Sequence, residues 1–557
     1  RMSMVRARRR RFSLTQVSAI GLLGLLGLVA LGGCSTQTTP SQRLQTTVIP
    51  EGGGSVQPAA GMFERGSVQT LSAQPADGYE FVEWQGDASG SANPVDLRMD
   101  TDRSVTAVFA EELQLPGYEQ SALPKVRIEL DGQTIVDEPK VPVRMRVLEQ
   151  GDVTYDGHAG IEYRGSTSQR LFEKKSYGFE TWDASGQDID VALLGFPEEE
   201  DWILYGPYSD KTLVRNVWVY GLAREIGDWA PRTRFVELEI DGAYQGVYVF
   251  MEKIKRDGDR VDIAKLDSDE NSGEDVTGGY LLKIDKTTGD TDDPDWSGDS
   301  RYTEALGFRS AYGVDGRRLE YAPYGPKQGE ETYFLYEYPD HQDITPAQKA
   351  YIQGYLDAFE TALAEGDFSD PAAEREYARY IDVDSFVEFF LLNELAHNAD
   401  AYRLSTFLHK DKNGPLRMGP VWDFNLSLGN DENEYRRSAQ TWIWHYNRYL
   451  PGDLWLVPFW WERLLDDPVF RAQVKARWGE LRGGAFSDAA LLGRVDEAVG
   501  LLEGDRAVER NFNRWPVIGV RVYGNGFVGQ SYGEEVAYLK EWIRQRTAWM
   551  DARIAEW

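Results

Sequence analysis

The order of two hydrophobic periodicities along the chain most constrains its fold. Between about residues 115 and 255, apolar and polar residues mostly alternate, as in "VRIELDG", "AGIEYRG" and "GVYVFMEKIK", which is typical of strands. After Trp442 the apolar spacing is helical almost to the end, as in "FWWERLLDDPVFRAQVKARWGELR" and "EEVAYLKEWIRQRTAWMDARIAEW". Strands followed by helices favour an α+β fold, here with two lobes, a helical C-terminal part and a cleft between the lobes.

Two helices are predicted before this C-terminal part. Residues 211–227, "KTLVRNVWVYGLAREIG", have apolar residues at helical spacing, with Asp210 as N-cap and Gly227 just past the C-terminus. The segment "DSFVEFFLLNELAHNAD" predicts a second helix that starts near Asp384 and runs into a polar loop. At 557 residues, the chain is long enough for two or three domains.

The N-terminal segment is typical of an export signal. Residues 1–33 carry six arginines and no acidic residue, and the apolar run 17–31 is short for a membrane span. The run ends at Leu31-Gly32-Gly33-Cys34, which resembles the lipobox of bacterial lipoproteins, and Cys34 is the only cysteine. We therefore expect residues 1–33 to be removed and Cys34 to be lipid-modified. This predicts an exported protein, anchored in the cell envelope by its lipid, at the outer membrane if there is one.

A small β-rich segment follows the predicted anchor. Residues 34–45 are polar and predict a tether, whereas residues 46–112 have short alternating strands separated by turn residues. The second segment resembles the divergent InlB B-repeat, through Gly66, Val68 and Leu71, then "GYEFVEW", Gly86, Asn93-Pro94 and "SVTAVF". Only one copy is present, so a spacer is the simpler interpretation and ligand binding is the alternative.

The charge of the chain excludes some partners. Its formal net charge is −31, which repels nucleic acid and anionic membrane surfaces. A basic protein substrate or a divalent cation would suit it. The single cysteine also excludes intrachain disulfides and a zinc–thiolate cluster.

The stretch "GPVWDFNLSLGN" places one carboxylate, Asp423, in an otherwise apolar run. Burying a lone carboxylate is costly, so Asp423 either caps a turn or holds a cation. Residues 404–411 and 415–423 predict a β-hairpin around a turn at 412–414, which brings the ends of the hairpin together. Asp400 would then lie near Asp423, where one carboxylate can position a hydroxyl while the other binds metal.

A second group of residues lies in "YRGSTSQRLFEKKSYGFE", residues 163–180. Arg164 leads into a Ser/Thr-rich loop with Ser166 and Ser168, which could cradle an anion. Lys174 and Lys175 follow on a strand, and since neighbouring strand residues face opposite sides, only one can point into a cleft. An exposed hairpin with a basic turn is the alternative.

Two more charged residues have unusual positions. Arg215 lies in the first turns of the predicted internal helix, where a cation is unfavourable, so it needs a carboxylate or phosphate partner. Glu252 ends an apolar strand, either at a hinge between lobes or where the strand reaches solvent. No Walker A loop or H-E-x-x-H motif occurs, and Ser531 in "GQSYG" has no later histidine to serve as a triad base.

Taken together, the ordered segments resemble the CotH kinase family, which has an atypical protein-kinase-like fold. They are "YRGSTSQRLFEKKSYGFE", "DWILYGPYSDKTLVRN", "RFVELEIDGAYQGVYVFMEKIKRDGDRVDI", "GGYLLKID", "NADAYRLSTFLHKD" and "GPVWDFNLSLGN". The resemblance runs from about Val126 to Ile554, within a predicted domain of residues 120–557. It implies transfer of the ATP γ-phosphate, with Mg²⁺, to Ser or Thr of a protein.

The resemblance also implies roles for the residues above. Asp400 would orient the acceptor hydroxyl, and Asp423 would bind the metal. Lys174 or Lys175 would bind the phosphates, which the loop from Arg164 to Ser168 would cover. Arg215 would contact phosphate or Asp423, and Glu252 would lie near the adenine.

The sequence departs from the usual kinase pattern, because it has no H-R-D motif and no glycine after Asp423-Phe424. Ser405 stands where protein kinases place an asparagine that binds a second metal ion, and Asn425 or Asn398 would have to compensate. Two alternatives to the kinase therefore remain, a catalytically inactive adhesin or scaffold and an enzyme that transfers AMP.

Overall fold

The computed structural model describes residues 40–227, 229–287, 302–323 and 329–557. The chain divides after Glu112 into two compact units, residues 1–112 and residues 113–557. The predicted signal segment and Cys34 lie outside the described residues. Within the described ranges, no helix has the length and apolar character that crossing a membrane requires.

The smaller unit is all-β and consists of two sheets around a core that includes Trp84 and Phe109. One sheet has the order β3-β1-β7-β5 and the other the order β2-β4-β6. Strand β1 begins at Ser41, so the last part of the segment predicted as a tether belongs to the first sheet. The strands are β1 (Ser41–Ile49), β2 (Gly54–Gln57), β3 (Gly61–Glu64), β4 (Val68–Pro75), β5 (Tyr79–Gly86), β6 (Val95–Arg98) and β7 (Arg103–Glu111).

The first part of the larger unit is a closed seven-stranded barrel in the order β10-β11-β12-β14-β13-β8-β9. It closes because β9 pairs with β10 and β8 pairs in parallel with β13, which leaves no exposed sheet edge. Aromatic and aliphatic side chains such as Trp202 and Phe250 fill it. The strands are β8 (Lys125–Glu129), β9 (Val141–Glu149), β10 (Asp152–Arg164), β11 (Ser176–Trp182), β12 (Asp201–Tyr205), β13 (Thr233–Ile240) and β14 (Ala243–Glu252).

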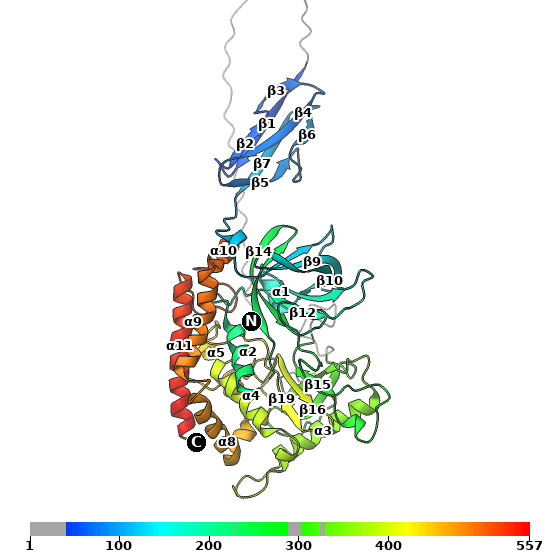
Figure 1. The fold of residues 1–557 in the computed structure, drawn as a ribbon, viewed down its shortest axis with the longest axis vertical. Coiled ribbons are helices and arrows are strands. Elements are labelled where there is room, and N and C mark those ends of the chain that lie inside the picture. Colours follow the sequence, from blue (N-terminus) through cyan, green and yellow to red (C-terminus); the bar gives the residue numbers. More distant parts are fainter. Residues whose placement is uncertain (1–39, 228, 288–301, 324–328) are drawn as a thin grey trace, which may run out of the picture. The chain divides into compact units, whose positions relative to one another are not determined.

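A second, five-stranded sheet lies in the same unit, in the order β16-β17-β15-β18-β19. Its strands β18 and β19 form the predicted hairpin, with Leu408 opposite Met418, but both are shorter than predicted and β19 ends before Asp423. Helix α3 lies beside this sheet (Figure 1). The strands are β15 (Tyr280–Ile284), β16 (Gly307–Gly313), β17 (Glu331–Tyr338), β18 (Thr406–Lys410) and β19 (Leu416–Met418).

Helices predominate in the C-terminal part of the larger unit, where α9 and α11 pack side by side (Figure 1). The predicted helical C-terminal part is therefore confirmed. The helices are α1 (Thr167–Leu171), α2 (Arg215–Ile226), α3 (Pro346–Ala364), α4 (Val383–Ala396), α5 (Glu434–Arg437), α6 (Tyr446–Tyr449), α7 (Trp460–Asp466), α8 (Pro468–Arg482), α9 (Asp488–Gly504), α10 (Ala507–Arg514) and α11 (Tyr532–Ala555), with short 3₁₀ turns at Tyr118–Gln120, Asp275–Thr277, Glu376–Arg379 and Ile443–His445.

The two internal helices begin and end for identifiable reasons. Helix α2 ends at Gly227, which adopts the predicted left-handed conformation at φ 109°. It begins at Arg215, later than predicted, because Leu213 has φ 66°, outside the helical region, while the Asp210 carboxylate accepts the backbone N–H of Arg215. Helix α4 begins at Val383, where the carboxylate of Asp382 accepts the backbone N–H of Ser385.

The α+β class predicted from the sequence is confirmed. The closed barrel was not predicted, because closure depends on the parallel β8–β13 pairing between strands far apart in the sequence. Helix α10 reaches back onto the barrel, where the buried guanidinium of Arg510 pairs with the buried carboxylate of Glu237 at 2.7 Å.

Candidate functional site

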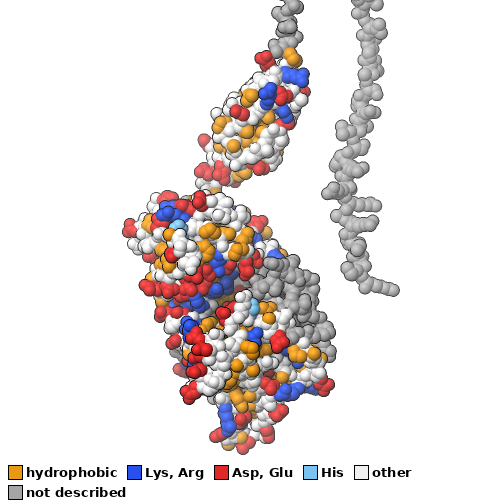
Figure 2. All heavy atoms as spheres, turned by 90° about the vertical axis from the view of Figure 1, so that its right-hand side faces the viewer, with side chains coloured by type: hydrophobic (Ala, Val, Ile, Leu, Met, Phe, Trp, Pro, Cys, Tyr) orange, Lys and Arg blue, Asp and Glu red, His pale blue; other side chains and the backbone are white. Residues whose placement is uncertain are grey.

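A cavity of about 530 Å³ lies in the larger unit, lined on one side by the barrel and on the other by the five-stranded sheet and the loops that follow it. Figure 2 shows acidic and basic side chains gathered around a hollow in the surface of this unit. The carboxylates that line the cavity include those of Asp285, Asp400 and Asp423. The two aspartates that the hairpin was expected to bring together therefore face one space.

Asp400 is held in the loop that follows α4. The loop begins at His397, whose left-handed backbone ends the helix, and Asn398 accepts the backbone N–H of Asp400 at 3.2 Å. The buried guanidinium of Arg403 donates to Asp400 Oδ1 at 3.0 Å and also to the carbonyl of Ala399. The Asp400 side chain remains 20% exposed, so a substrate can reach it.

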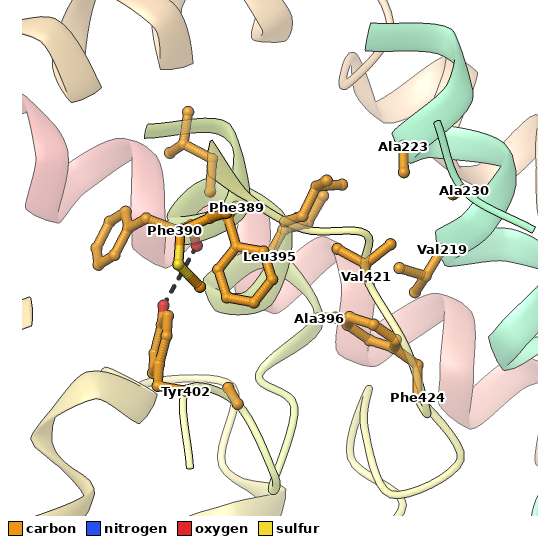
Figure 3. Packing of buried hydrophobic residues seen from close by; sticks show 14 of the residues in the cluster. Val219, Ala223, Ala230, Phe389, Phe390, Leu395, Ala396, Tyr402, Val421 and Phe424 are labelled. Atoms are coloured by element: carbon orange, nitrogen blue, oxygen red, sulfur yellow. Dashed lines mark hydrogen bonds between the residues drawn. The ribbon is translucent and has the colours of Figure 1, made fainter. Parts of the chain in front are cut away.

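Asp423 is held by the packing of the residues beside it. Val421 and Phe424 lie in the buried cluster with Val219 of α2 and Ala396 of α4 (Figure 3). The backbone N–H of Asp423 donates to the Tyr220 hydroxyl at 3.1 Å. Its φ of 59° is in the left-handed region, which is rare for a residue other than glycine and occurs mainly where neighbouring contacts fix the backbone.

The environment of Asp423 disfavours a negative charge. Burial, the charge of Asp400 and the charge of Asp285, in that order, raise the pKa of Asp423 to about 7, while Lys286 and Arg164 oppose the rise. A divalent cation would compensate these carboxylates and remove the cost of ionising Asp423.

The loop after β10 lines the opposite side of the cavity, as the anion-cradle hypothesis requires. Arg164, Ser166 and Ser168 all line the cavity, and Gly165 between them has φ 101°. The Arg164 guanidinium lies 5.4 Å from the centre of the Trp422 ring. Burial lowers the pKa of Arg164, although the charges of Glu337, Glu162 and Asp423 oppose this. Arg164 thus places a cation near Asp423.

Lys174 and Lys175 do not line the cavity, which corrects the sequence-based expectation. The Lys174 ammonium is buried, donating to the Val247 carbonyl at 2.5 Å and to Asn511 Oδ1 at 2.8 Å. Burial, with the charge of Arg514, lowers its pKa well below the usual value. Lys175 donates to the carbonyls of Gln169 and Phe172 instead. One lysine therefore joins the barrel to α10, and the other holds the turn after Arg164.

Arg215 has a carboxylate partner, one of the two kinds predicted, but it does not line the cavity. Its guanidinium is buried and donates to Asp210 at 2.5 Å and to the carbonyls of Ser427 and Leu428. The expected contact with phosphate or Asp423 is therefore replaced by a structural one. Arg215 fixes the loop that follows Asp423.

Glu252 also lies away from the cavity. Its buried carboxylate accepts from the Arg232 guanidinium at 2.6 Å and from the Arg232 backbone N–H at 2.7 Å. These bonds join the ends of β13 and β14. The Glu252 carboxylate is thus bonded within the barrel, and because the preceding residue Met251 lines the cavity, the position near an adenine stays a prediction.

Asn425 lines the cavity, and its carbonyl accepts from the Asn430 side chain at 2.8 Å. Asn398 supports Asp400 and is not among the residues that line the cavity. His397 is buried and bonded to the Arg436 carbonyl and to Thr441, so its role is structural.

Sequence reasoning missed the charged end of strand β15. Lys283, Asp285 and Lys286 all line the cavity, and they come from the segment "GGYLLKID" and the residue after it. The sequence does contain a signal for these residues, because three charged side chains lie at the end of an apolar strand. However, the charged end of β15 lies near the Asp400 loop only because β15 pairs with β18, and the sequence alone does not reveal this pairing.

The donors at the cavity fit a hard divalent cation. Aspartate and asparagine oxygens are the ligands that Mg²⁺ prefers, and Asp423 and Asn425 supply both kinds. Arg164, Lys283, Lys286 and Arg403 place positive charge around the same space, which suits an anionic ligand such as a phosphate chain.

Comparison with known proteins agrees with these features. The family model described as CotH kinase protein matches residues 161–550, and the model described as divergent InlB B-repeat domain matches residues 44–113. No curated protein matches the chain. Because the first match covers most of the chain and includes the loops of Arg164, Asp400 and Asp423, this protein belongs to the CotH kinase protein family.

Proposed function

We propose that the protein is an atypical protein kinase that transfers the γ-phosphoryl group of ATP to a Ser or Thr hydroxyl of a protein. The observation that carries the proposal is the meeting of Asp400, Asp423 and the Arg164 loop at one cavity. In this proposal the barrel and the helical part correspond to the two lobes of a kinase, with the cavity between them.

Each group would have a separate task. When bound, ATP supplies the phosphoryl group, and Mg²⁺ neutralises part of its charge. Arg164, with the hydroxyls of Ser166 and Ser168, binds phosphate oxygens, and Asp423 with Asn425 holds the ion. Asp400 would accept a hydrogen bond from the acceptor hydroxyl and take its proton as the new oxygen–phosphorus bond forms and the bond from the γ-phosphorus to the β-phosphate oxygen breaks, with ADP as the leaving group. Positioning and charge compensation account for most of the catalysis of such a transfer.

The proposal extends to where the protein works and on what. We propose that the chain is exported and anchored by a lipid on Cys34, with the β module as a spacer. A basic or Ser/Thr-rich protein substrate would suit its charge of −31. Replacing Cys34 with Ser should release the protein from the membrane fraction; retention there would contradict the anchor.

The activity can be tested with ATP labelled at either the α- or the γ-phosphate. The full-length chain is incubated with Mg²⁺, casein or histone as acceptor, and each label in turn. Transfer of γ-label to protein, lost in Asp423→Asn and Asp400→Asn, is the expected result. Transfer of α-label would support AMP transfer instead.

The absence of both labels, with no binding of Mg²⁺-ATP, would overturn both enzymatic proposals. The inactive adhesin or scaffold would then be favoured. The control is Glu138→Gln, which removes a charge that also lines the cavity but has no task in the scheme.

A further inference from the structure

The carboxylate of Asp285 has a fixed place at the cavity. Asp285 follows β15, and its Oδ1 accepts the backbone N–H of Lys286 at 2.8 Å. The backbone N–H of Ser405 also bonds to this carboxylate. Strand β15 pairs with β18 so that Ile284 is opposite Thr406, which explains why the chain just after Asp400 meets Asp285.

Asp285, Asp400 and Asp423 all line the same cavity, so their carboxylates share one space. The charges of Asp400 and Asp285 both raise the pKa of Asp423, after burial, the largest cause. Burial likewise raises the pKa of Asp285 itself, against the opposing effect of Lys283. Carboxylates gathered at one buried space are stabilised by a cation placed among them.

The identity of residue 405 affects how many metal ligands the Asp400 loop can supply. Ser405 stands where the kinase pattern has a metal-binding asparagine, and a serine hydroxyl is a weaker ligand for Mg²⁺ than a carboxylate. At this point of the chain, the Ser405 backbone points at a carboxylate from another strand. The pairing of β15 with β18 thus brings a carboxylate beside the loop position that lacks an asparagine.

We infer that Asp285 is a second carboxylate ligand of the divalent cation held by Asp423, in place of the asparagine that the Asp400 loop lacks. The inference rests on the proposed function for the presence of the ion. It assigns to Asp285 a role that Asn425 alone would otherwise have to fill. Asp285 keeps one face bonded to backbone N–H groups, which orient the carboxylate toward the cavity.

The test measures metal binding directly. Mn²⁺ replaces Mg²⁺, and its free concentration is followed by electron paramagnetic resonance with the full-length chain and a non-hydrolysable ATP analogue. Asp285→Asn should weaken Mn²⁺ binding by about tenfold or more. The matched control is Asp137→Asn, because Asp137 lines the same cavity but is exposed. This control should bind Mn²⁺ within about twofold of the unaltered chain.

A second variant separates a ligand from a structural residue. Asp285→Cys offers a thiolate, which prefers Cd²⁺ to Mn²⁺, so the affinity for Cd²⁺ relative to Mn²⁺ should rise by about tenfold or more. Asp137→Cys is its control, because it places an exposed thiol at the same cavity, and Asp285→Cys should raise the ratio well above the value that this control gives. A residue that only supports the loop would not change which metal is preferred.

The outcomes distinguish the two proposals. If the unaltered chain binds no Mn²⁺ with the nucleotide analogue, the proposed function fails. If it binds Mn²⁺ and Asp285→Asn binds equally well, the proposed function stands and the inference is overturned. Circular dichroism checks the fold of each variant. Unfolding of both Asp285 variants without metal would also overturn the inference, because it would show that Asp285 supports the fold itself.

Discussion

Replacing Asp423 with Asn should stabilise the protein in the absence of metal. The pKa of Asp423 is raised from 3.8 to about 7. At about 1.4 kcal/mol per pH unit, ionising this carboxyl in the folded protein costs about 4 kcal/mol. Asparagine removes the charge, keeps nearly the same shape and tolerates the left-handed φ of 59°. Asp423→Ala is a poorer choice, because alanine is strained at this φ.

The sign of the effect follows from where protons are bound. Between about pH 4 and pH 7 the folded chain keeps the proton of Asp423 while the unfolded chain has released it, so stability falls as the pH rises. The Asp423→Asn variant has no carboxyl group at this position, so its stability does not fall in this way as the pH rises. Its advantage in the free energy of unfolding should be near zero at about pH 4 and should reach about 4 kcal/mol at about pH 8.

Urea denaturation with EDTA, followed by tryptophan fluorescence at several pH values, measures this difference. Added Mg²⁺ should stabilise the unaltered chain and not the variant, so it should shrink the difference at about pH 8. The reasoning is refuted if Asp423→Asn is no more stable than the unaltered chain above pH 7, or if the difference does not change with pH.

A second carboxylate of the cavity supplies a control with the opposite sign. Burial raises the pKa of Asp453, but the Arg403 guanidinium, the Trp455 N–H and the Tyr446 hydroxyl outweigh burial and lower it overall. Asp453 therefore contributes stability above the ordinary pKa of aspartate, and that stability is lost as the pH falls. Asp453→Asn should destabilise the protein near neutral pH.

Three further substitutions test other parts of the site. Gly165→Ala should cost about 1–2 kcal/mol in the free energy of unfolding, because alanine is strained at φ 101° and its Cβ would meet Ser168 Oγ; urea denaturation measures this. Lys174→Met should lower the free energy of unfolding by about 1–3 kcal/mol but leave the affinity for an ATP analogue within about twofold. Calorimetry measures this affinity, and a large loss would contradict the position of Lys174 away from the cavity. Arg215→Gln should cost about 3–5 kcal/mol, because Asp210 would stay buried without its counter-charge, and a stable variant would refute this.

Local patterns predicted the elements that lie next to the two central aspartates. The hairpin followed from a turn at 412–414 between two apolar runs, and β18 and β19 do pair, but the return strand ends at Met418 and leaves Asp423 in the loop that follows. The helix before Asp400 followed from its apolar spacing. Both depend on neighbours in the sequence, and so they could be predicted.

Side-chain directions were harder to predict, because they depend on distant partners. Alternation left open which of Lys174 and Lys175 faced a cleft, and neither does, since Lys174 is bonded to Asn511 from α10. Arg215 finds its carboxylate in Asp210, just before its own helix, and its carbonyl partners beyond Asp423. Asp285 reached the site through the pairing of β15 with β18, which no local pattern contains.

The contact of α10 with the barrel determines when the barrel can finish folding during synthesis. Arg510 lies 273 positions after its partner Glu237, and Asn511 lies 337 positions after Lys174. During synthesis, the barrel strands therefore leave the ribosome long before the groups that satisfy their buried carboxylate and ammonium. The barrel can reach its final packing only after nearly the whole chain has been translated. A nascent chain would stay incompletely folded until then, and premature termination before α10 should leave a product that quality-control proteases degrade.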